Sequence, residues 1–145
     1  RTMVVKNGCG VGDIINRIDS DIKFGFDNDK SVIKLATFLN KKTHFKDASF
    51  KGISKVDSLR EIDALFAINW LHGLELSLIN AMFSHLISTS KIKYIIVDQL
   101  LKINNNQNVH NYDQIFASNF KKLKIENDDG DNVRNILVFK NKFLK

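Results

Sequence analysis

The segment best suited to ligand chemistry is a glycine-rich turn near the start of the chain. Residues 7–13 read NGCGVGD and follow the short apolar run 3–5, which is typical of a buried strand. Glycine lets the backbone turn tightly and approach a ligand closely. The predicted helix start at Asp13 adds free N–H groups and a partial positive charge. We therefore predict that Gly8, Cys9, Gly10 and Gly12 border a ligand, the alternative being a tight turn without one.

The spacing of these glycines separates classes of ligand. A dinucleotide-binding turn, G-x-G-x-x-G, would place its third glycine at position 13, where this chain has Asp13. An acid at that point would also repel a pyrophosphate. Asp27 follows Gly8 by about 20 residues, a distance at which an acid accepts hydrogen bonds from ribose hydroxyls. A nucleoside without phosphates fits these residues better than NAD or ATP.

Later strand-like runs also end on residues that could meet a ligand. Asp47 and Ala48 follow the run 43–47, and the segment 69–72, which contains Trp70 and His72, follows the apolar run 64–68. Ligands of open α/β sheets bind beyond the carboxyl ends of the strands. His72 could act there as a base, but it can equally pack or cap a helix. Trp70 is either a wall of the pocket or part of the core.

The elements that must position these residues alternate along the chain. Strands are expected at 3–5, 22–27, 43–47, 64–68 and 93–98, followed by a hairpin of 122–126 and 132–140 around the turn 127–131. Helices are expected at 13–18, after a cap at Asp29, at 76–86 and at 112–120, with a short helix or turn at 56–61 and a polar loop at 104–108. Val32, Ile33, Leu35, Ala36 and Leu39 should form the buried face of the second helix. This alternation predicts one α/β domain over residues 1–145, with a mainly parallel sheet and helices on both faces.

Composition excludes several classes of protein. With 145 residues and one cysteine, Cys9, the chain has no internal disulfide framework and no multi-cysteine metal site. His44, His85 and His110 lack the spacing of metal ligands, so no metal is expected. The apolar stretches are shorter than the ~18–20 residues of a membrane span. The net charge of +6 comes from dispersed lysines, so nucleic acid is not favoured as a partner.

Four segments of the chain resemble, in order, the motifs of class I S-adenosylmethionine-dependent methyltransferases. Residues 4–13 resemble the first motif, 24–27 the second and 45–48 the third, and residues 63–72 are similar to the fourth strand and its exit. The terminal hairpin is similar to the last two strands of that fold. The order and spacing agree over nearly the whole chain.

The resemblance implies a Rossmann-like, doubly wound sheet of seven strands in the order 3-2-1-4-5-7-6, closed by an antiparallel hairpin. It also implies that S-adenosylmethionine is the cofactor. Asp27, with Asn28 beside it, would hold the ribose, and Asp47 and Ala48 the adenine side. The glycine turn would hold the methionine end, and Asn69 and Trp70 would border it, with His72 as the candidate catalytic residue. The expected activity is in-line methyl transfer to a small-molecule acceptor, for which positioning can supply much of the catalysis.

Two departures from the family pattern keep alternatives open. Lys6 stands where the family usually has an acid, so its charge must turn away or pair with Asp13. The family's N-terminal helix is missing and the chain begins with Arg1, so we expect a cofactor-binding core taken from a longer protein. A catalytically silent binding or scaffold module is therefore the first alternative, and the basic charge supports an RNA-directed methyltransferase as the second. The exit 69–72 lacks the Asn-Pro-Pro-aromatic pattern of DNA amino-methylating enzymes. A cytoplasmic location is expected, whereas the acceptor and the oligomeric state cannot be read from the sequence.

Overall fold

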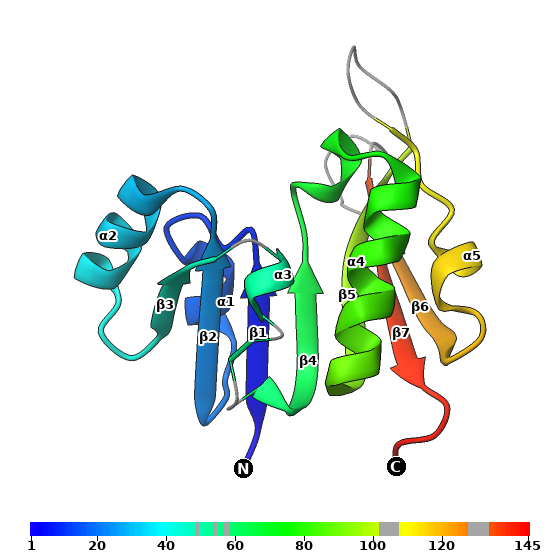
Figure 1. The fold of residues 1–145 in the computed structure, drawn as a ribbon, viewed down its shortest axis with the longest axis horizontal. Coiled ribbons are helices and arrows are strands. Elements are labelled where there is room, and N and C mark those ends of the chain that lie inside the picture. Colours follow the sequence, from blue (N-terminus) through cyan, green and yellow to red (C-terminus); the bar gives the residue numbers. More distant parts are fainter. Residues whose placement is uncertain (49, 54, 57–58, 102–107, 128–133) are drawn as a thin grey trace.

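The chain folds around one seven-stranded sheet, seen in a computed structural model that describes all residues except 49, 54, 57–58, 102–107 and 128–133 (Figure 1). The strands are β1 (Met3–Asn7), β2 (Ile22–Asp27), β3 (His44–Asp47), β4 (Glu61–Ala67), β5 (Lys91–Leu100), β6 (Phe120–Asn127) and β7 (Arg134–Asn141). Their order in the sheet is β3-β2-β1-β4-β5-β7-β6. The first five strands pair in parallel, and β7 pairs antiparallel with both β5 and β6. The predicted fold class and strand order are confirmed.

Helices cover both faces of the sheet (Figure 1). The helices are α1 (Asp13–Arg17), α2 (Lys30–Leu39), α3 (Phe50–Ile53), α4 (Leu76–Thr89) and α5 (Tyr112–Phe116), with a short 3-10 helix, η2 (Leu71–Gly73). In Figure 1, α3, α4 and α5 lie in front of the sheet, α1 lies behind it and α2 lies beside the edge strand β3. Because β1 to β5 pair in parallel, their carboxyl ends all lie at the same edge of the sheet, the upper one in Figure 1.

The core fills the space between the central strands and α4. Val5, Leu65 and Ile95 come from neighbouring strands and are fully buried with Phe83 of α4. Phe83 meets the ring of Phe116 edge-on at 4.9 Å, which joins α4 to α5. Such aromatic pairs add about 0.5–1.5 kcal/mol beyond the area they bury. This packed layer gives the strand ends a rigid base.

Several predicted boundaries were wrong. The short helix at Phe50–Ile53 was not predicted, and β4 begins at Glu61, before the expected 64. Within the segment 56–61, where a short helix or turn was expected, the Leu59 N–H donates to the Val56 carbonyl at 2.9 Å, and residues 57–58 lie outside the described residues. The helix expected to reach Phe120 stops at Phe116, because Phe120 already begins β6. The hairpin strands are present, but most of the predicted turn 127–131 and of the polar loop 104–108 lies outside the described residues.

The second helix is capped as predicted but buries less than its pattern indicates. The Asp29 carboxylate accepts hydrogen bonds from the N–H groups of Ser31 and Val32. Ile33 and Ala36 are buried, whereas Leu35 and Leu39 are 48% and 57% exposed. The helix lies against only the edge of the sheet, so only a narrow stripe of its apolar face meets the core. Within the described residues, no helix combines the length and apolar character needed to cross a membrane.

Gly25 in β2 gives a test of this packing near the strand ends. A Cβ at Gly25 would lie 2.6 Å from Cδ1 of Phe45 and 3.1 Å from Sγ of Cys9. We predict that Gly25→Ala lowers the free energy of unfolding by about 1–3 kcal/mol, because the added methyl overpacks this layer. Urea denaturation measures it. Gly73→Ala is the matched control, since a Cβ there meets no atom within 4 Å. Equal effects of both substitutions would contradict this account.

Candidate functional site

The glycine turn lies where the strand order reverses. After β1 the chain builds β2 and β3 on one side, then crosses to place β4 on the other side of β1. At such a switch point the connections leave in opposite directions and open a crevice beyond the strand ends. The turn that follows β1 therefore lies at the position where open α/β sheets bind ligands.

The backbone of the glycine turn, residues 8–12, requires its glycines. Gly8, Gly10 and Gly12 have φ angles of 63°, 54° and 96°, in the left-handed region that other residues rarely adopt. The Cys9 N–H donates to the carbonyl of Phe26 at 2.9 Å, which ties the turn to β2. A Cβ at Gly12 would lie 2.8 Å from the ring of Phe45, so the turn also packs closely against β3.

The Asp27 carboxylate joins this turn to the end of β2. Its Oδ2 accepts from the Gly10 N–H at 3.0 Å, and its Oδ1 accepts from the Asp29 N–H at 3.1 Å. A carboxylate has about four lone-pair sites, so two remain for further donors. Asp47 stands beside Asp27 in the parallel register of β3 and β2, and the Ala48 N–H donates to the Asp27 carbonyl at 2.9 Å. Asn28 is exposed directly after Asp27.

The side chains of Trp70 and Lys6 both lie against Gly8, the first residue of the glycine turn. The indole of Trp70 lies so close to Gly8 that a Cβ on Gly8 would be 2.5 Å from Trp70 Cδ1. The Lys6 ammonium donates to the carbonyls of Gly8 and Ile68, at 2.6 and 3.5 Å. Neither arrangement expected for Lys6 is seen in the described residues: its ammonium makes no ion pair with Asp13, and it lies on the Gly8 carbonyl instead of turning away from the glycine turn.

Burial disfavours the positively charged form of Lys6 in this position. Lys6 is 3% exposed, and burial lowers the pKa of its ammonium below the usual range. The negative charges of Asp98, Asp27 and Asp13 oppose this effect. Burial also raises the pKa of the Cys9 thiol to about 11, so the thiol is protonated at neutral pH. Cys9 therefore fills space in the turn and is not poised as a nucleophile.

Asp98, Asn69 and Arg134 form a polar cluster at the neighbouring strand ends. The carboxylate of Asp98, at the end of β5, is buried and accepts from the Asn69 N–H at 3.1 and 3.2 Å. Nη1 of Arg134, in β7, lies 3.2 Å from Asp98 Oδ2 and also donates to Oδ1 of Asn69. Asn69 has a φ of 74°, so the cluster holds it in a left-handed conformation. No sequence pattern joins Arg134 to Asp98, because only the antiparallel β5–β7 pairing brings Arg134 here.

His72 lies in η2, just beyond β4, as the sequence predicts for the candidate catalytic residue. Its Nδ1 is buried and makes no hydrogen bond within the described residues. His110, by contrast, is buried with its Nε2 3.0 Å from the Leu71 carbonyl and supports the same segment. No group of three or more potential metal ligands occurs among the described residues.

The ion pair of Arg134 and Asp98 provides a second test. We predict that Arg134→Met lowers the free energy of unfolding by about 3 kcal/mol, because it leaves the buried Asp98 carboxylate without its cation. Urea denaturation monitored by circular dichroism measures the loss. Lys91→Met is the control, because its pair with Glu61 is exposed and worth less than about 1 kcal/mol. Similar losses in both variants would show that the cluster adds no special stability.

Comparisons with known proteins place this geometry among solved structures. No protein-family profile and no curated protein sequence matches the chain. Magnesium protoporphyrin IX methyltransferase from Synechocystis PCC 6803, solved with bound S-adenosylmethionine, superposes with a TM-score of 0.75 at 15% identity, over 97% of this chain and 70% of that protein. The N-methyltransferase NodS from Bradyrhizobium japonicum WM9, in complex with S-adenosylhomocysteine, gives a TM-score of 0.77 at 9% identity, over 97% and 78%.

A third similar structure is a small RNA methyltransferase, with a TM-score of 0.71 at 16% identity. It covers 99% of this chain, which spans 23% of that larger protein. Such low identities establish architecture rather than activity. Together with the observed strand order, they show that the chain has the fold of the class I S-adenosylmethionine-dependent methyltransferases.

Proposed function

We propose that this protein binds S-adenosylmethionine and transfers its methyl group to a small-molecule acceptor. The observation that carries the proposal is the hydrogen bond between Gly10 and Asp27, which joins a left-handed glycine turn to an acid at the switch point of the sheet. The turn brings backbone close to a ligand, and Asp27 keeps acceptor sites for ribose hydroxyls. Structural neighbours crystallised with this cofactor or its demethylated product support the choice of nucleoside.

Each side chain of the site then has a proposed role. Asp27 accepts from the ribose hydroxyls and Asn28 lies next to it, while Asp47 and Ala48 border the adenine. Gly8, Cys9, Gly10 and Gly12 contact the methionine end, with Asn69 and Trp70 on the side of the reacting methyl. When bound, the cofactor would supply a methyl group on a sulfonium: the acceptor's lone pair would bond to the methyl carbon in line with the breaking C–S bond, and S-adenosylhomocysteine would leave. The protein contributes orientation and exclusion of water, and His72 is the candidate base for the acceptor proton.

A small-molecule acceptor is supported more strongly than RNA. Magnesium protoporphyrin IX methyltransferase is named for a small-molecule acceptor, whereas the RNA methyltransferase contains this architecture as 23% of its length. The basic charge of the chain remains the only sequence support for RNA. The cytoplasmic location expected from the sequence stays a prediction.

Titration with S-adenosylhomocysteine tests the proposed function directly. Trp70 is the only tryptophan of the chain and touches Gly8, so its fluorescence should change as the nucleoside binds. We predict that Asp27→Ala weakens binding by about tenfold or more, since a hydrogen-bonded charge is worth about 1.5–3 kcal/mol. Calorimetry gives the same affinity independently of fluorescence.

Two further variants make this test specific. Asp27→Asn keeps an acceptor oxygen for Gly10 and should lose less affinity than Asp27→Ala. Asp19→Ala removes an exposed acid outside the site and should bind as the unaltered protein does. Absence of binding at millimolar S-adenosylhomocysteine would overturn the proposal. Binding without methyl transfer to any acceptor offered would instead favour the silent binding module.

Lys6 predicts a pH-dependent preference between the two forms of the cofactor. Its buried ammonium at Gly8 should disfavour the sulfonium of S-adenosylmethionine relative to the neutral sulfur of S-adenosylhomocysteine. Because the pKa of Lys6 is lowered, its charge is lost at a lower pH than that of an exposed lysine. The affinity ratio of sulfonium to neutral ligand should therefore rise with pH above neutrality.

The ratio of the two affinities, measured by calorimetry between about pH 7 and about pH 9.5, tests this expectation. Both ligands carry the same amine and carboxylate, so their own titration cancels to a first approximation. Lys6→Gln should raise the ratio several-fold at neutral pH and make it independent of pH. A ratio that stays flat in the unaltered protein would show that the Lys6 charge does not reach the sulfur.

A further inference from the structure

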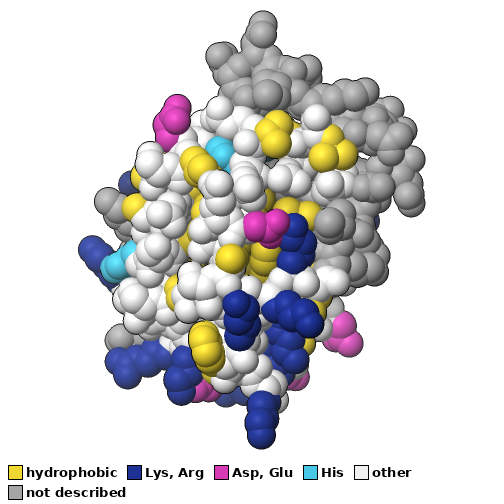
Figure 2. Space-filling view, turned by 90° about the vertical axis from the view of Figure 1, so that its right-hand side faces the viewer, with side chains coloured by type: hydrophobic (Ala, Val, Ile, Leu, Met, Phe, Trp, Pro, Cys, Tyr) yellow, Lys and Arg dark blue, Asp and Glu magenta, His cyan; other side chains and the backbone are white. Residues whose placement is uncertain are grey.

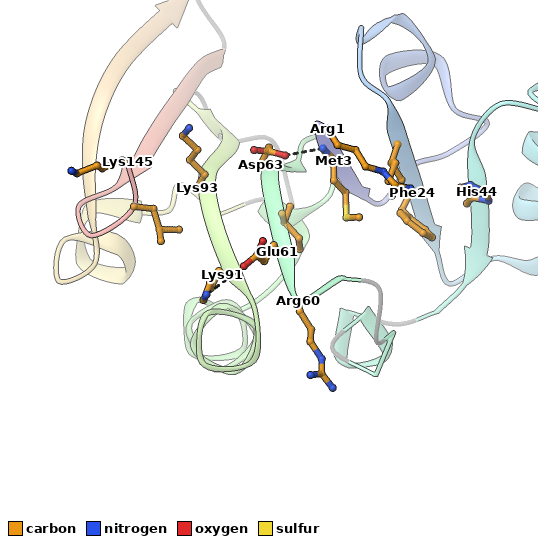
Figure 3. Close-up of a pocket in the computed structure, with 13 residues that line it drawn as sticks. Arg1, Met3, Phe24, His44, Arg60, Glu61, Asp63, Lys91, Lys93 and Lys145 are labelled. Carbon is orange, nitrogen blue, oxygen red and sulfur yellow. Dashed lines mark hydrogen bonds and ion pairs between the residues drawn. The ribbon is translucent and has the colours of Figure 1, made fainter.

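A cavity of about 810 Å³ lies at the end of the sheet opposite the glycine turn. It is lined by the first residues of the parallel strands, among them Met3, Ile22, His44 and Glu61, and by the C-terminal residues Leu144 and Lys145 (Figure 3). Small-molecule sites in proteins typically enclose about 300–1,000 Å³. The cavity, called the amino-end pocket below, is therefore large enough for a small organic ligand.

The amino-end pocket has a mixed lining. Met3, Ile22 and Leu144 supply apolar surface between charged side chains. Phe24 and Ile62 also border the pocket, but they are 7% and 2% exposed and present little surface to a ligand. The lining therefore suits a ligand that combines an apolar part with a charged part.

The charges around the amino-end pocket are mostly positive. The acids are already engaged, because Glu61 lies 3.3 Å from Lys91 and Asp63 accepts from the Met3 N–H at 2.8 Å (Figure 3). Lys93 and Lys145 make no ion pair in the described part of the chain. Figure 2 shows Lys and Arg side chains gathered over the lower part of the β6 side, toward the end where the parallel strands begin. Within the amino-end pocket itself, an anionic group on a ligand would meet Lys93 and Lys145, which line it.

The amino-end pocket is separate from the proposed nucleoside site. The two lie at opposite ends of the parallel strands, and the five residues of β1 separate them by about 15 Å at about 3.3 Å per residue. The three glycines and Asp27 contribute nothing to its lining. A ligand held at one end would leave the other end free.

We propose that the amino-end pocket binds an amphipathic small molecule with an apolar or aromatic body and one anionic head group. The body lies on the partly exposed Met3, Ile22 and Leu144, and the head group pairs with Lys93 and Lys145. Because Glu61 and Asp63 are engaged within the protein, the cations can pair with a ligand. The site requires no cofactor and is independent of the methyl-transfer proposal.

A pair of fluorescent probes that differ only in the head group tests this proposal. Anilinonaphthalene sulfonate carries an aromatic body and one anionic group, and N-phenyl-1-naphthylamine has the same body without the charge. We predict that the sulfonate binds one molecule per chain, about tenfold more tightly than the neutral probe. Lys93→Glu should weaken the sulfonate about five- to tenfold, the effect of about 1 kcal/mol of lost charge pairing, and leave the neutral probe nearly unchanged.

Matched controls separate this site from general effects of charge and folding. Lys34→Glu changes the net charge equally on the exposed side of α2 and should leave both probes unaffected. Lys145→Glu, in the exposed C-terminal residue, should reproduce the Lys93 effect without disturbing the sheet. Equal affinity for both probes, equal effects of Lys34→Glu and Lys93→Glu, or displacement of the sulfonate by S-adenosylhomocysteine would overturn the proposal. Circular dichroism confirms that each variant is folded.

Discussion

The contact on which the candidate site depends is the hydrogen bond from the Gly10 N–H to the Asp27 carboxylate. It joins the ends of β1 and β2, so a turn that glycine alone would leave flexible acquires one conformation. The same carboxylate also accepts from Asp29, which places the start of α2. One acid therefore orients the glycine turn, its own remaining lone pairs and the next helix. A ligand that binds here would meet groups that the fold has already positioned, which reduces the cost of ordering them.

The charge distribution of this site differs from the pattern its fold implies. Lys6 occupies the position of an acid, and its ammonium bridges the carbonyls of Gly8 and Ile68. These hydrogen bonds tie the glycine turn to the residue that follows β4. They also hold a buried positive charge near the expected position of the sulfonium. Asp98 holds a second buried charge, balanced by Arg134. The site thus contains two buried charges: the Asp98 carboxylate, which is paired with Arg134, and the Lys6 ammonium, whose pKa is lowered by burial.

The two ends of the parallel sheet have different chemistry. At the carboxyl ends, acids and glycines face the switch point, whereas apolar residues and lysines surround the amino ends. This separation follows from parallel pairing, because every strand start lies at one edge and every strand end at the other. A single small domain can therefore offer two independent binding surfaces. Their distance along the strands allows ligands of different charge to be bound without direct contact.

Local sequence signals determined much of this protein. Hydrophobic runs, the glycine spacing and Asp29 correctly predicted the alternation of strands and helices, the turn after β1 and the cap of α2, because each depends on neighbouring residues. The strand order depends on crossovers between distant segments, and it was expected from the family resemblance rather than from these local signals. They failed where tertiary packing overrides local preference, as in the early end of α5 at Phe116 and the exposed Leu39. Only the tertiary structure decided that Lys6 turns to backbone carbonyls, that Trp70 covers Gly8 and that Arg134 reaches Asp98. Except for the short contact from Lys6 to Gly8, these contacts join residues far apart in the chain, as Lys6 and Ile68 are. No local pattern encodes which side chains the assembled sheet brings together.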